Sequence, residues 1–271
     1  MSRNEVMAGA AAWSYPGHGR NAEVGVVVVH GFLGNPTSTR PLGEALGEAG
    51  YAVEVPRLPG HGTSWRDLAG TRYPDWRRAA EDVFNELRSN CREVVLVGLS
   101  VGGTIVLDVT AGRCRAGRAS DVAGLVTINA LVLDREKLVA KLAPVLRFVL
   151  PVVTTSQAGV QTNDIAKGGD EKAYSFVPSH AGYSLARELP RIRLALGDIA
   201  VPALVIHSAQ DHTVDPRNAA AIVERLGSER LGSSDVTEHV LERSYHVATL
   251  DYEAEQLNTA IRDFVARVTR P

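Results

Sequence analysis

Residues 93–104 have the sequence E-V-V-L-V-G-L-S-V-G-G-T, and this stretch decides the fold. Its first part, Val94–Val97, is a run of apolar, mostly β-branched residues that predicts a short strand buried on both faces. A G-x-S-x-G pattern follows, with Ser100 between Gly98 and Gly102. A serine in this pattern sits on a sharp turn from strand to helix, where larger side chains at the glycine positions would collide with the turn. We therefore expect the Ser100 hydroxyl to stand above the edge of a sheet.

Strands and helices alternate on both sides of this turn. The apolar runs predict further strands at 24–29, 51–55, 122–130, 202–207 and 236–241, and the helical spacings predict helices at 41–49, 73–89, 102–113, 183–196, 217–226 and 253–268. This order predicts an α/β fold with a mostly parallel central sheet and helices on both faces. Residues 1–23 are expected to be a frayed lead-in with at most one edge strand.

The alternation is interrupted at about 131–179. A chain of 271 residues commonly forms one α/β domain, so we expect a single domain over 1–271 with a small cap insertion at this place. The cap is supported by apolar residues at helical spacing, Leu138, Leu142, Val145, Leu146 and Val149, and by the further apolar residue Phe148. They could form an apolar wall over Ser100 that accepts an acyl chain, or equally pack the cap onto the core.

The charge and residue composition indicate which kinds of molecule the protein is expected to bind. The 29 basic and 31 acidic residues give a net charge of −2, and the absence of like-charge runs argues against nucleic acid or an acidic membrane surface. The two cysteines lack metal-ligand spacing, and neither a metal nor a cofactor is expected. No apolar stretch reaches the ~18 residues of a membrane helix, and the N-terminus is a poor signal peptide. We expect a cytoplasmic protein with a small-molecule partner and no stable membrane insertion; the oligomeric state is not indicated.

A serine hydroxyl needs a base within hydrogen-bond reach and an acid that orients the base. A nucleophile on this kind of turn is followed in the chain by the acid and then by the histidine. Asp211 and His246 each lie just beyond a predicted strand, at the sheet edge where sites form in open α/β folds. We predict that His246 takes the proton from Ser100 and that Asp211 fixes the tautomer of His246 and stabilises its charged form.

Other residues compete for these roles. Asp134 also ends a predicted strand and could supply the acid, whereas Asp215 is expected to cap the next helix. His30 lies at a strand end near the nucleophile, but it precedes the serine in the chain and adjoins the glycine turn 30–34. We interpret His30 as a scaffold for that turn.

Acyl transfer also needs donors for the oxyanion of the tetrahedral intermediate. The backbone N–H of Val101, at the start of the helix after Ser100, and that of Phe32, in the glycine turn, are predicted to supply them. Phe32 could otherwise simply end a strand.

Several motifs together resemble one family. They are H-G-F-L-G at 30–34, R-P-L at 40–42, P-R-L-P-G-H-G-T at 56–63, G-L-S-V-G-G-T at 98–104, I-N-A at 128–130, P-A-L at 202–204, D-H at 211–212 and S-Y-H-V-A-T-L-D at 244–251. This combination, which runs from about residue 23 to the end and thins across 131–170, resembles the bacterial monoacylglycerol lipases and the related carboxylesterases of the α/β-hydrolase fold.

The resemblance implies roles for individual residues. Ser100, Asp211 and His246 match the catalytic triad of that family, and Phe32 and Val101 match its oxyanion positions. Val101 replaces the methionine that is usual after the serine, which changes the pocket wall. Glu171 matches an acidic cap residue that meets the glycerol hydroxyls in the lipases, although it could equally be a solvated surface carboxylate. Independently of the resemblance, the polar side chain of Glu171 or Asn129 is expected to be able to bind the alcohol part of an ester substrate.

The function expected from the sequence is a serine ester hydrolase that cleaves monoacylglycerols through an acyl-enzyme on Ser100. Three alternatives stay open: a general carboxylesterase, an acyltransferase, and a non-catalytic ligand-binding α/β-hydrolase. The complete triad and both oxyanion turns argue against the last of these, because a binding module needs none of them together.

Overall fold

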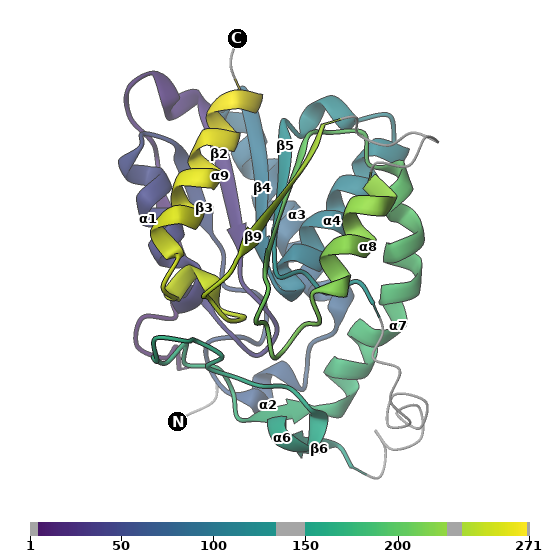
Figure 1. The fold of residues 1–271 in the computed structure, drawn as a ribbon. Coiled ribbons are helices and arrows are strands. Elements are labelled where there is room, and N and C mark those ends of the chain that lie inside the picture. Colours follow the sequence, from purple (N-terminus) through teal and green to yellow (C-terminus); the bar gives the residue numbers. More distant parts are fainter. Residues whose placement is uncertain (1–4, 134–149, 227–234, 270–271) are drawn as a thin grey trace.

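A central parallel sheet organises the protein. The computed structural model describes residues 5–133, 150–226 and 235–269. Within these residues a seven-stranded sheet is parallel except for the edge strand β1, which pairs antiparallel with β3 (Figure 1). In spatial order the strands are β1 (Trp13–Tyr15), β3 (Ala52–Val55), β2 (Val24–Val29), β4 (Glu93–Leu99), β5 (Gly124–Ile128), β8 (Ala203–Ser208) and β9 (Val236–Leu241). The predicted fold class is confirmed.

Strand β2 explains why helices cover both faces. The helices are α1 (Arg40–Glu48), α3 (Tyr73–Asn90), α4 (Val101–Arg115), α7 (Ser179–Ala195), α8 (Arg217–Leu226) and α9 (Ala254–Val268). All six residues of β2 are buried, and its valines are divided between two apolar cores. Val26 and Val28 belong to the core under α1 and α9, and Val27 and Val29 to the core under α3, α4, α7 and α8. Each fully buried valine contributes roughly 1.5–3 kcal/mol to folding.

Between β5 and β8 the chain leaves the sheet. The part of this excursion from 150 to 178, called the inserted segment below, lies beyond the carboxyl ends of the strands (Figure 1). It contains the short antiparallel pair β6 (Val152–Thr154) and β7 (Phe176–Pro178), with the one-turn helix α6 (Thr155–Ala158) after β6. The apolar residues predicted to form a cap wall, 138–149, lie outside the described residues.

Most predicted elements end within two residues of the observed ends, and two larger differences remain. Helix α7 begins at Ser179, four residues earlier than predicted, because Pro178 is extended and ends β7 directly before the helix. The one-turn helix α2 (Trp65–Leu68) was not predicted, since four residues are too few for an apolar period. The side chain of Ser64 caps α2 by accepting a hydrogen bond from the N–H of Asp67.

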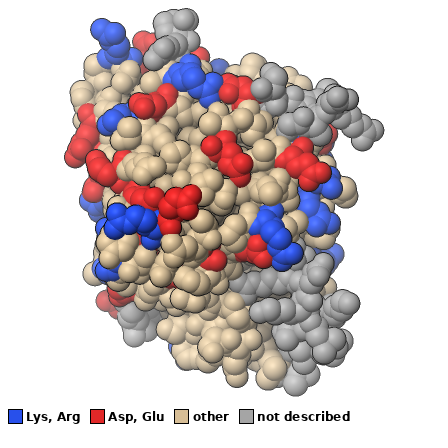
Figure 2. Space-filling model, viewed as in Figure 1, with Lys and Arg blue, Asp and Glu red and all other residues tan. Residues whose placement is uncertain are grey.

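The surface carries mixed charge. On the face in Figure 2, acidic and basic side chains are interspersed over the sheet and its helices, and the lower part around the inserted segment carries fewer charges. No helix in the described part of the chain is both long enough and apolar enough to cross a membrane.

Candidate active site

Ser100 occupies the strained turn that its flanking glycines predict. Its backbone has φ 56° and ψ −121°, a conformation that is rare for a residue with a side chain. A Cβ on Gly98 would lie 2.3 Å from the backbone of Gly102, and a Cβ on Gly102 would lie 2.1 Å from the carbonyl oxygen of Val29. The N–H of Ser100 donates to the carbonyl of Ile128 at 2.8 Å, which ties the turn to β5. The sheet therefore presents Ser100 at the start of α4.

Asp211 and His246 meet beyond the ends of β8 and β9. Nδ1 of His246 lies 2.7 Å from Oδ2 of Asp211, and both side chains are buried. Oδ1 of Asp211 accepts hydrogen bonds from the N–H groups of Thr213 and Val214, both at 2.7 Å. Because a carboxylate only accepts, the proton of a neutral His246 is on Nδ1, and Nε2 is its basic nitrogen.

The electrostatic surroundings favour a protonated His246. Burial lowers the pKa of its imidazole, but the nearby carboxylates of Asp211, Glu171 and Asp164 outweigh burial, and the pKa ends above its ordinary value. A histidine in this setting accepts a proton readily and holds the resulting charge.

Two competing residues have other contacts. Asp215 binds the N–H and the guanidinium of Arg217 at the start of α8, as a capping residue would. His30 is fully buried: its Nδ1 donates to the carbonyl of Gly31, and its Nε2 accepts from the N–H of Leu58. Burial lowers the pKa of His30 to about 4, so it is neutral at pH 7 and both ring nitrogens are engaged. The scaffold role predicted for His30 is confirmed, and Asp134 lies outside the described residues.

The glycine turn brings Phe32 close to the nucleophile. A Cβ on Gly31 would lie only 3.0 Å from Cβ of Ser100, so the close approach of this turn requires glycine. Phe32 and Val101 both line the cavity that contains Ser100. Val101 is the first residue of α4, where backbone N–H groups have no partner within the helix and the helix dipole is positive.

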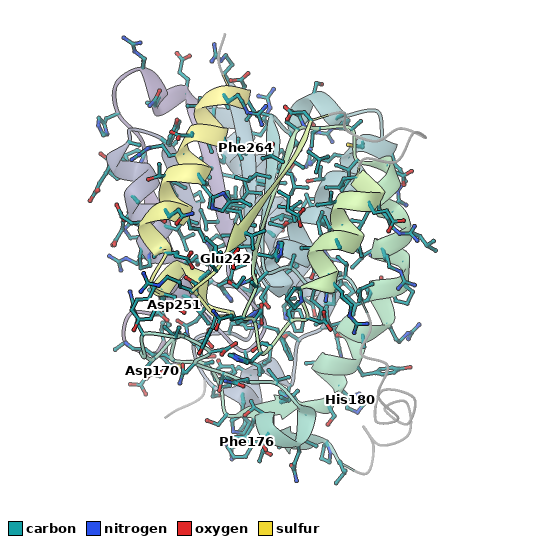
Figure 3. The ribbon with its side chains drawn as sticks, viewed as in Figure 1. Asp170, Phe176, His180, Glu242, Asp251 and Phe264 are labelled. Carbon is teal, nitrogen blue, oxygen red and sulfur yellow. The ribbon has the colours of Figure 1, made fainter. Side chains whose placement is uncertain are left out.

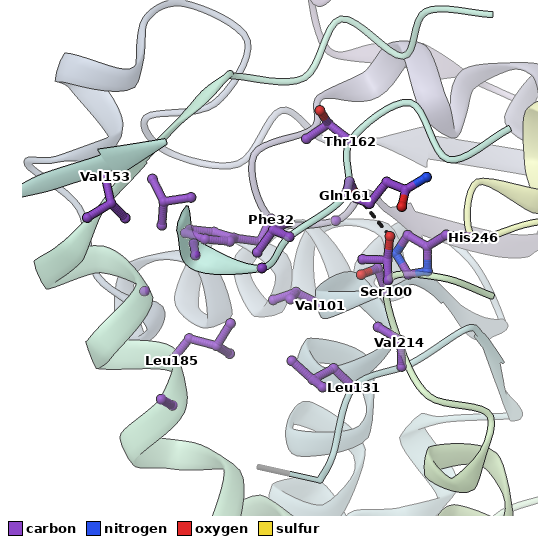
Figure 4. A pocket seen from close by; sticks show the side chains of 18 of the residues that line it. Phe32, Ser100, Val101, Leu131, Val153, Gln161, Thr162, Leu185, Val214 and His246 are labelled. Carbon is purple, nitrogen blue, oxygen red and sulfur yellow. Dashed lines mark hydrogen bonds between the residues drawn. The ribbon is translucent and has the colours of Figure 1, made fainter. Parts of the chain in front are cut away.

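A cavity of about 810 Å³ lies between the sheet edge and the inserted segment. Ser100 and His246 are neighbours on its wall, and Leu185 and Val153 line it farther away (Figure 4). Its apolar lining includes Leu131, Leu133, Val153, Val177, Leu185 and Leu189. Such a cavity has the size and apolar character of a small-molecule site.

Glu171 lines this cavity and is not a solvated surface residue. Its side chain is buried, and Oε1 accepts a hydrogen bond from the N–H of Asn163 at 2.9 Å. Oε2 lies on the side of the glycine turn, 3.6 Å from where a Cβ on Gly34 would stand. Burial raises the pKa of Glu171, opposed by the N–H of Asn163 and the charge of His246.

Asn129 has a different place from the one predicted. It does not line the cavity, and its side chain is engaged with protein groups. Oδ1 accepts from the N–H of Ser208 at 2.7 Å, and Nδ2 donates to the carbonyl of His246 at 2.7 Å and to Oγ of Ser208 at 3.1 Å. Asn129 thus ties β5, β8 and the loop of His246 together and has no free group to offer a substrate.

Two buried aspartates at the site were missed by the sequence reasoning. Asp251 accepts hydrogen bonds from four backbone N–H groups, those of Tyr245, Ala166, Lys167 and Tyr252. In Figure 3 it lies between the loop after β9 and the inserted segment. Asp164, in the inserted segment, reaches the N–H of His246. Only the position of Asp251 at the end of the S-Y-H-V-A-T-L-D motif could have drawn attention to it.

Comparison with known proteins gives the family. Residues 20–253 match the model of the Hydrolase_4 family, described as serine aminopeptidase, S33. The chain belongs to this family. As a Hydrolase_4 member it is 36% identical over 252 residues to the thermostable monoacylglycerol lipase of Bacillus sp. (strain H-257), covering 93% of this chain and 94% of that protein. It is 24% identical over 252 residues to the carboxylesterase of Bacillus subtilis (strain 168), covering 92% of this chain and 95% of that protein.

Solved structures agree with the family assignment. The fold matches one of the metagenome-derived lipolytic enzymes LipS and LipT with a TM-score of 0.85 and 30% identity, covering 97% of this chain and 100% of that one. The Hydrolase_4 chain is therefore a serine hydrolase of the α/β-hydrolase fold, with a seven-stranded sheet and a small additional sheet in the inserted segment.

Proposed function

We propose that the protein is a carboxylic ester hydrolase that cleaves monoacylglycerols to a fatty acid and glycerol. The 36% identity to a monoacylglycerol lipase over nearly the whole chain supports the reaction. The observation that carries the substrate is Glu171, a buried carboxylate in a largely apolar cavity that also contains Ser100 and His246. An apolar cavity suits an acyl chain, and a carboxylate suits an alcohol with free hydroxyl groups.

In this proposal the reaction passes through an acyl-enzyme. Oγ of Ser100 attacks the ester carbonyl carbon while Nε2 of His246 takes its proton, and Asp211 stabilises the imidazolium through Nδ1. The N–H groups of Phe32 and Val101 bind the oxyanion. When the carbonyl–oxygen bond breaks, His246 gives the proton to the leaving glycerol, and the same groups then activate water to release the fatty acid.

Glu171 recognises the glycerol part. With Oε1 held by the N–H of Asn163, Oε2 accepts hydrogen bonds from the glycerol hydroxyls. A simple alkyl ester has no hydroxyls there and leaves Oε2 of this buried carboxylate without a hydrogen-bond donor, which penalises binding of the alkyl ester.

We also propose that the chain is one domain in which residues of about 131–179 form a cap over Ser100. Support comes from β6, α6, β7 and α7, whose residues line the cavity opposite the sheet edge. A cytoplasmic location belongs to the same proposal and can be tested by cell fractionation.

Initial rates on a series of monoacylglycerols beside alkyl esters of the same acyl length test the substrate. The wild type is expected to prefer the glycerol esters in kcat/KM, and Glu171→Gln to reduce this preference about tenfold, because the amide keeps one acceptor but loses the charge. Asp170→Asn, an equivalent change at the exposed neighbouring carboxylate, is the matched control.

The outcome separates the candidate functions. Equal rates on both ester classes, unchanged in Glu171→Gln, would favour a general carboxylesterase, the activity of the Bacillus subtilis relative. No turnover of any ester by the wild type would favour a ligand-binding module. Transfer of the acyl group to a competing alcohol would indicate an acyltransferase.

A further inference from the structure

Asp164 is a buried carboxylate of the inserted segment that the proposed reaction does not use directly. Its side chain has no exposed surface, and it does not line the cavity. Oδ2 accepts hydrogen bonds from the N–H of His212 at 3.0 Å and from the N–H of His246 at 3.3 Å. Oδ1 lies 3.0 Å from Nδ1 of His212 and accepts from Nε2 of Gln161 at 3.2 Å. One carboxylate oxygen therefore joins two separate loops.

These two loops carry the acid and the base of the site. His212 directly follows Asp211, and His246 is itself the base. The loops begin where the ladder between β8 and β9 ends, at the pair Ser208–Leu241, so the sheet alone does not fix them against each other. The carbonyl of Asp164 adds a third contact by accepting from the N–H of Val247 at 3.0 Å.

The inserted segment also contacts the loop of Asp211 at a residue after Asp211 itself. Oγ1 of Thr213 donates to the carbonyl of Gln161 at 3.0 Å. The ring of His212 packs edge-on against the ring of Tyr245, with centroids 4.4 Å apart. Asp164 thus lies at the centre of a contact between the inserted segment and both loops.

We propose that Asp164 is a positioning residue for the reaction, which fixes the loops of Asp211 and His246 against each other from the inserted segment. The proposal rests on the proposed function, since it takes Asp211 and His246 as the acid and the base. Catalytic groups misplaced by about 1 Å can lose on the order of 10²-fold in rate. Docking of the inserted segment therefore controls the reactive geometry as well as the shape of the cavity.

The charge of Asp164 provides a second readout. The charges of Asp211, Glu171 and Asp164 all act on the imidazole of His246, and Nδ1 of His212 lies 3.0 Å from Oδ1 of Asp164. The negative charge of Asp164 helps to raise the pKa of His246. Loss of this charge lowers the pH at which kcat/KM reaches half of its plateau value on the acid side of its pH profile, called the acid limb below. Loss of a contact that only holds the loops in place would not shift this pH.

The test compares Asp164→Ala and Asp164→Asn with the wild type, with Asp170→Asn as the control and Ser100→Ala in the same assay. Asp164→Ala is expected to lower kcat about 10–100-fold with a much smaller change in KM. Asp164→Asn keeps an acceptor for the two N–H groups and is expected to recover most of kcat, with its acid limb at lower pH. Thermal unfolding of each variant establishes that it is folded.

The outcomes are distinct. The proposal is overturned if folded Asp164→Ala keeps kcat within about threefold of the wild type, or if Asp164→Asn is as impaired as Asp164→Ala. If Asp164→Ala does not fold, the pH profile of Asp164→Asn decides: a shifted acid limb supports the proposal, and an unchanged one overturns it. Full activity in Ser100→Ala would instead contradict the proposed function itself.

Discussion

The carboxyl edge of the sheet and the inserted segment that faces it are held in different ways. At the sheet edge, apolar strands and obligatory glycines fix the backbone, as at Gly98 and Gly102 around Ser100. The inserted segment contributes apolar residues such as Ile165 and Tyr174 to the cores, and it is also attached by polar side chains that bind backbone groups distant in sequence. Asn35 reaches the carbonyl of Lys172, and Asp251 reaches the N–H of Ala166. The backbone at the sheet edge is therefore fixed by steric packing, whereas the position of the segment also depends on side chains that hydrogen-bond to distant parts of the backbone.

The largest effect is expected at the sheet edge. Ser100→Ala removes the nucleophile and is expected to reduce kcat for ester hydrolysis on the order of 10⁴-fold or more. The melting temperature should not fall, because alanine keeps the Cβ and removes only the hydroxyl from a strained turn. Steady-state kinetics and thermal unfolding check the two statements; substantial residual turnover would place the nucleophile elsewhere.

A backbone collision at the same edge comes next. Gly102→Ala places a Cβ 2.1 Å from the carbonyl oxygen of Val29 and is expected to lower the free energy of unfolding by about 3 kcal/mol or more. Gly112→Ala on the same helix is the control. Its Cβ meets only the end of the Arg77 side chain, at 3.1 Å, and alanine in a helix gains up to about 1 kcal/mol over glycine. Equal urea midpoints for the two variants would refute the collision.

Removal of a side chain that attaches the inserted segment is expected to reduce the free energy of unfolding by a smaller amount. Asp251→Ala leaves four backbone N–H groups without their acceptor and is expected to cost about 2–3 kcal/mol in the free energy of unfolding. Burial raises the pKa of Asp251, but the backbone N–H donors outweigh it and hold the pKa below its ordinary value. The stabilisation by Asp251 is therefore present above the unfolded-state pKa of about 3.9 and is lost as the pH falls through the lower folded-state pKa.

Urea unfolding of the wild type and Asp251→Ala at a series of pH values measures how the stabilisation by Asp251 depends on pH. The difference between their free energies of unfolding should be constant near neutral pH and should shrink only in the acid range. A difference that grew with acidification would contradict the ionised, hydrogen-bonded state of Asp251.

The smallest expected effect is a shift in a pH profile. Since the carboxylates around His246 raise its pKa above 6.5, kcat/KM should reach half of its plateau value at a pH above 6.5 on the acid side. Below that pH the base is already protonated and cannot take the proton of Ser100. An acid limb with its midpoint below 6.5 would mean that burial outweighs Asp211, Glu171 and Asp164.

The two regions also differ in how far the sequence predicts them. Val24–Val29 forms the predicted strand, and the glycines around Ser100 have the predicted steric cause, because each pattern depends on neighbours within a few residues. The Asp211–His246 contact followed from the order of the strands. Asp164 and Asp251 were missed because most of their partners are backbone N–H groups, which carry no sequence signal, and because some of these, such as His246 for Asp164 and Ala166 for Asp251, are more than 80 residues away.

Asn129 is a residue for which the sequence predicts a substrate-binding role that its contacts in the structure do not support. An asparagine at the end of a strand near the nucleophile has the chemistry to bind an alcohol, and the sequence gives no reason to reject that role. The structure shows its amide engaged with Ser208 and with the carbonyl of His246. Which polar side chains at a sheet edge remain free for a substrate depends on the loops that pack over it, and these are tertiary features.

The central claim is that ester hydrolysis proceeds through a covalent intermediate on Ser100, and covalent trapping tests it most directly. The protein would be incubated with an alkyl fluorophosphonate, and its intact mass and peptide map would be measured with residual esterase activity. We expect one adduct per chain on Ser100, loss of activity in proportion to labelling, and no adduct in Ser100→Ala. Labelling of another residue with parallel loss of activity, or full activity in the protein labelled at Ser100, would contradict it.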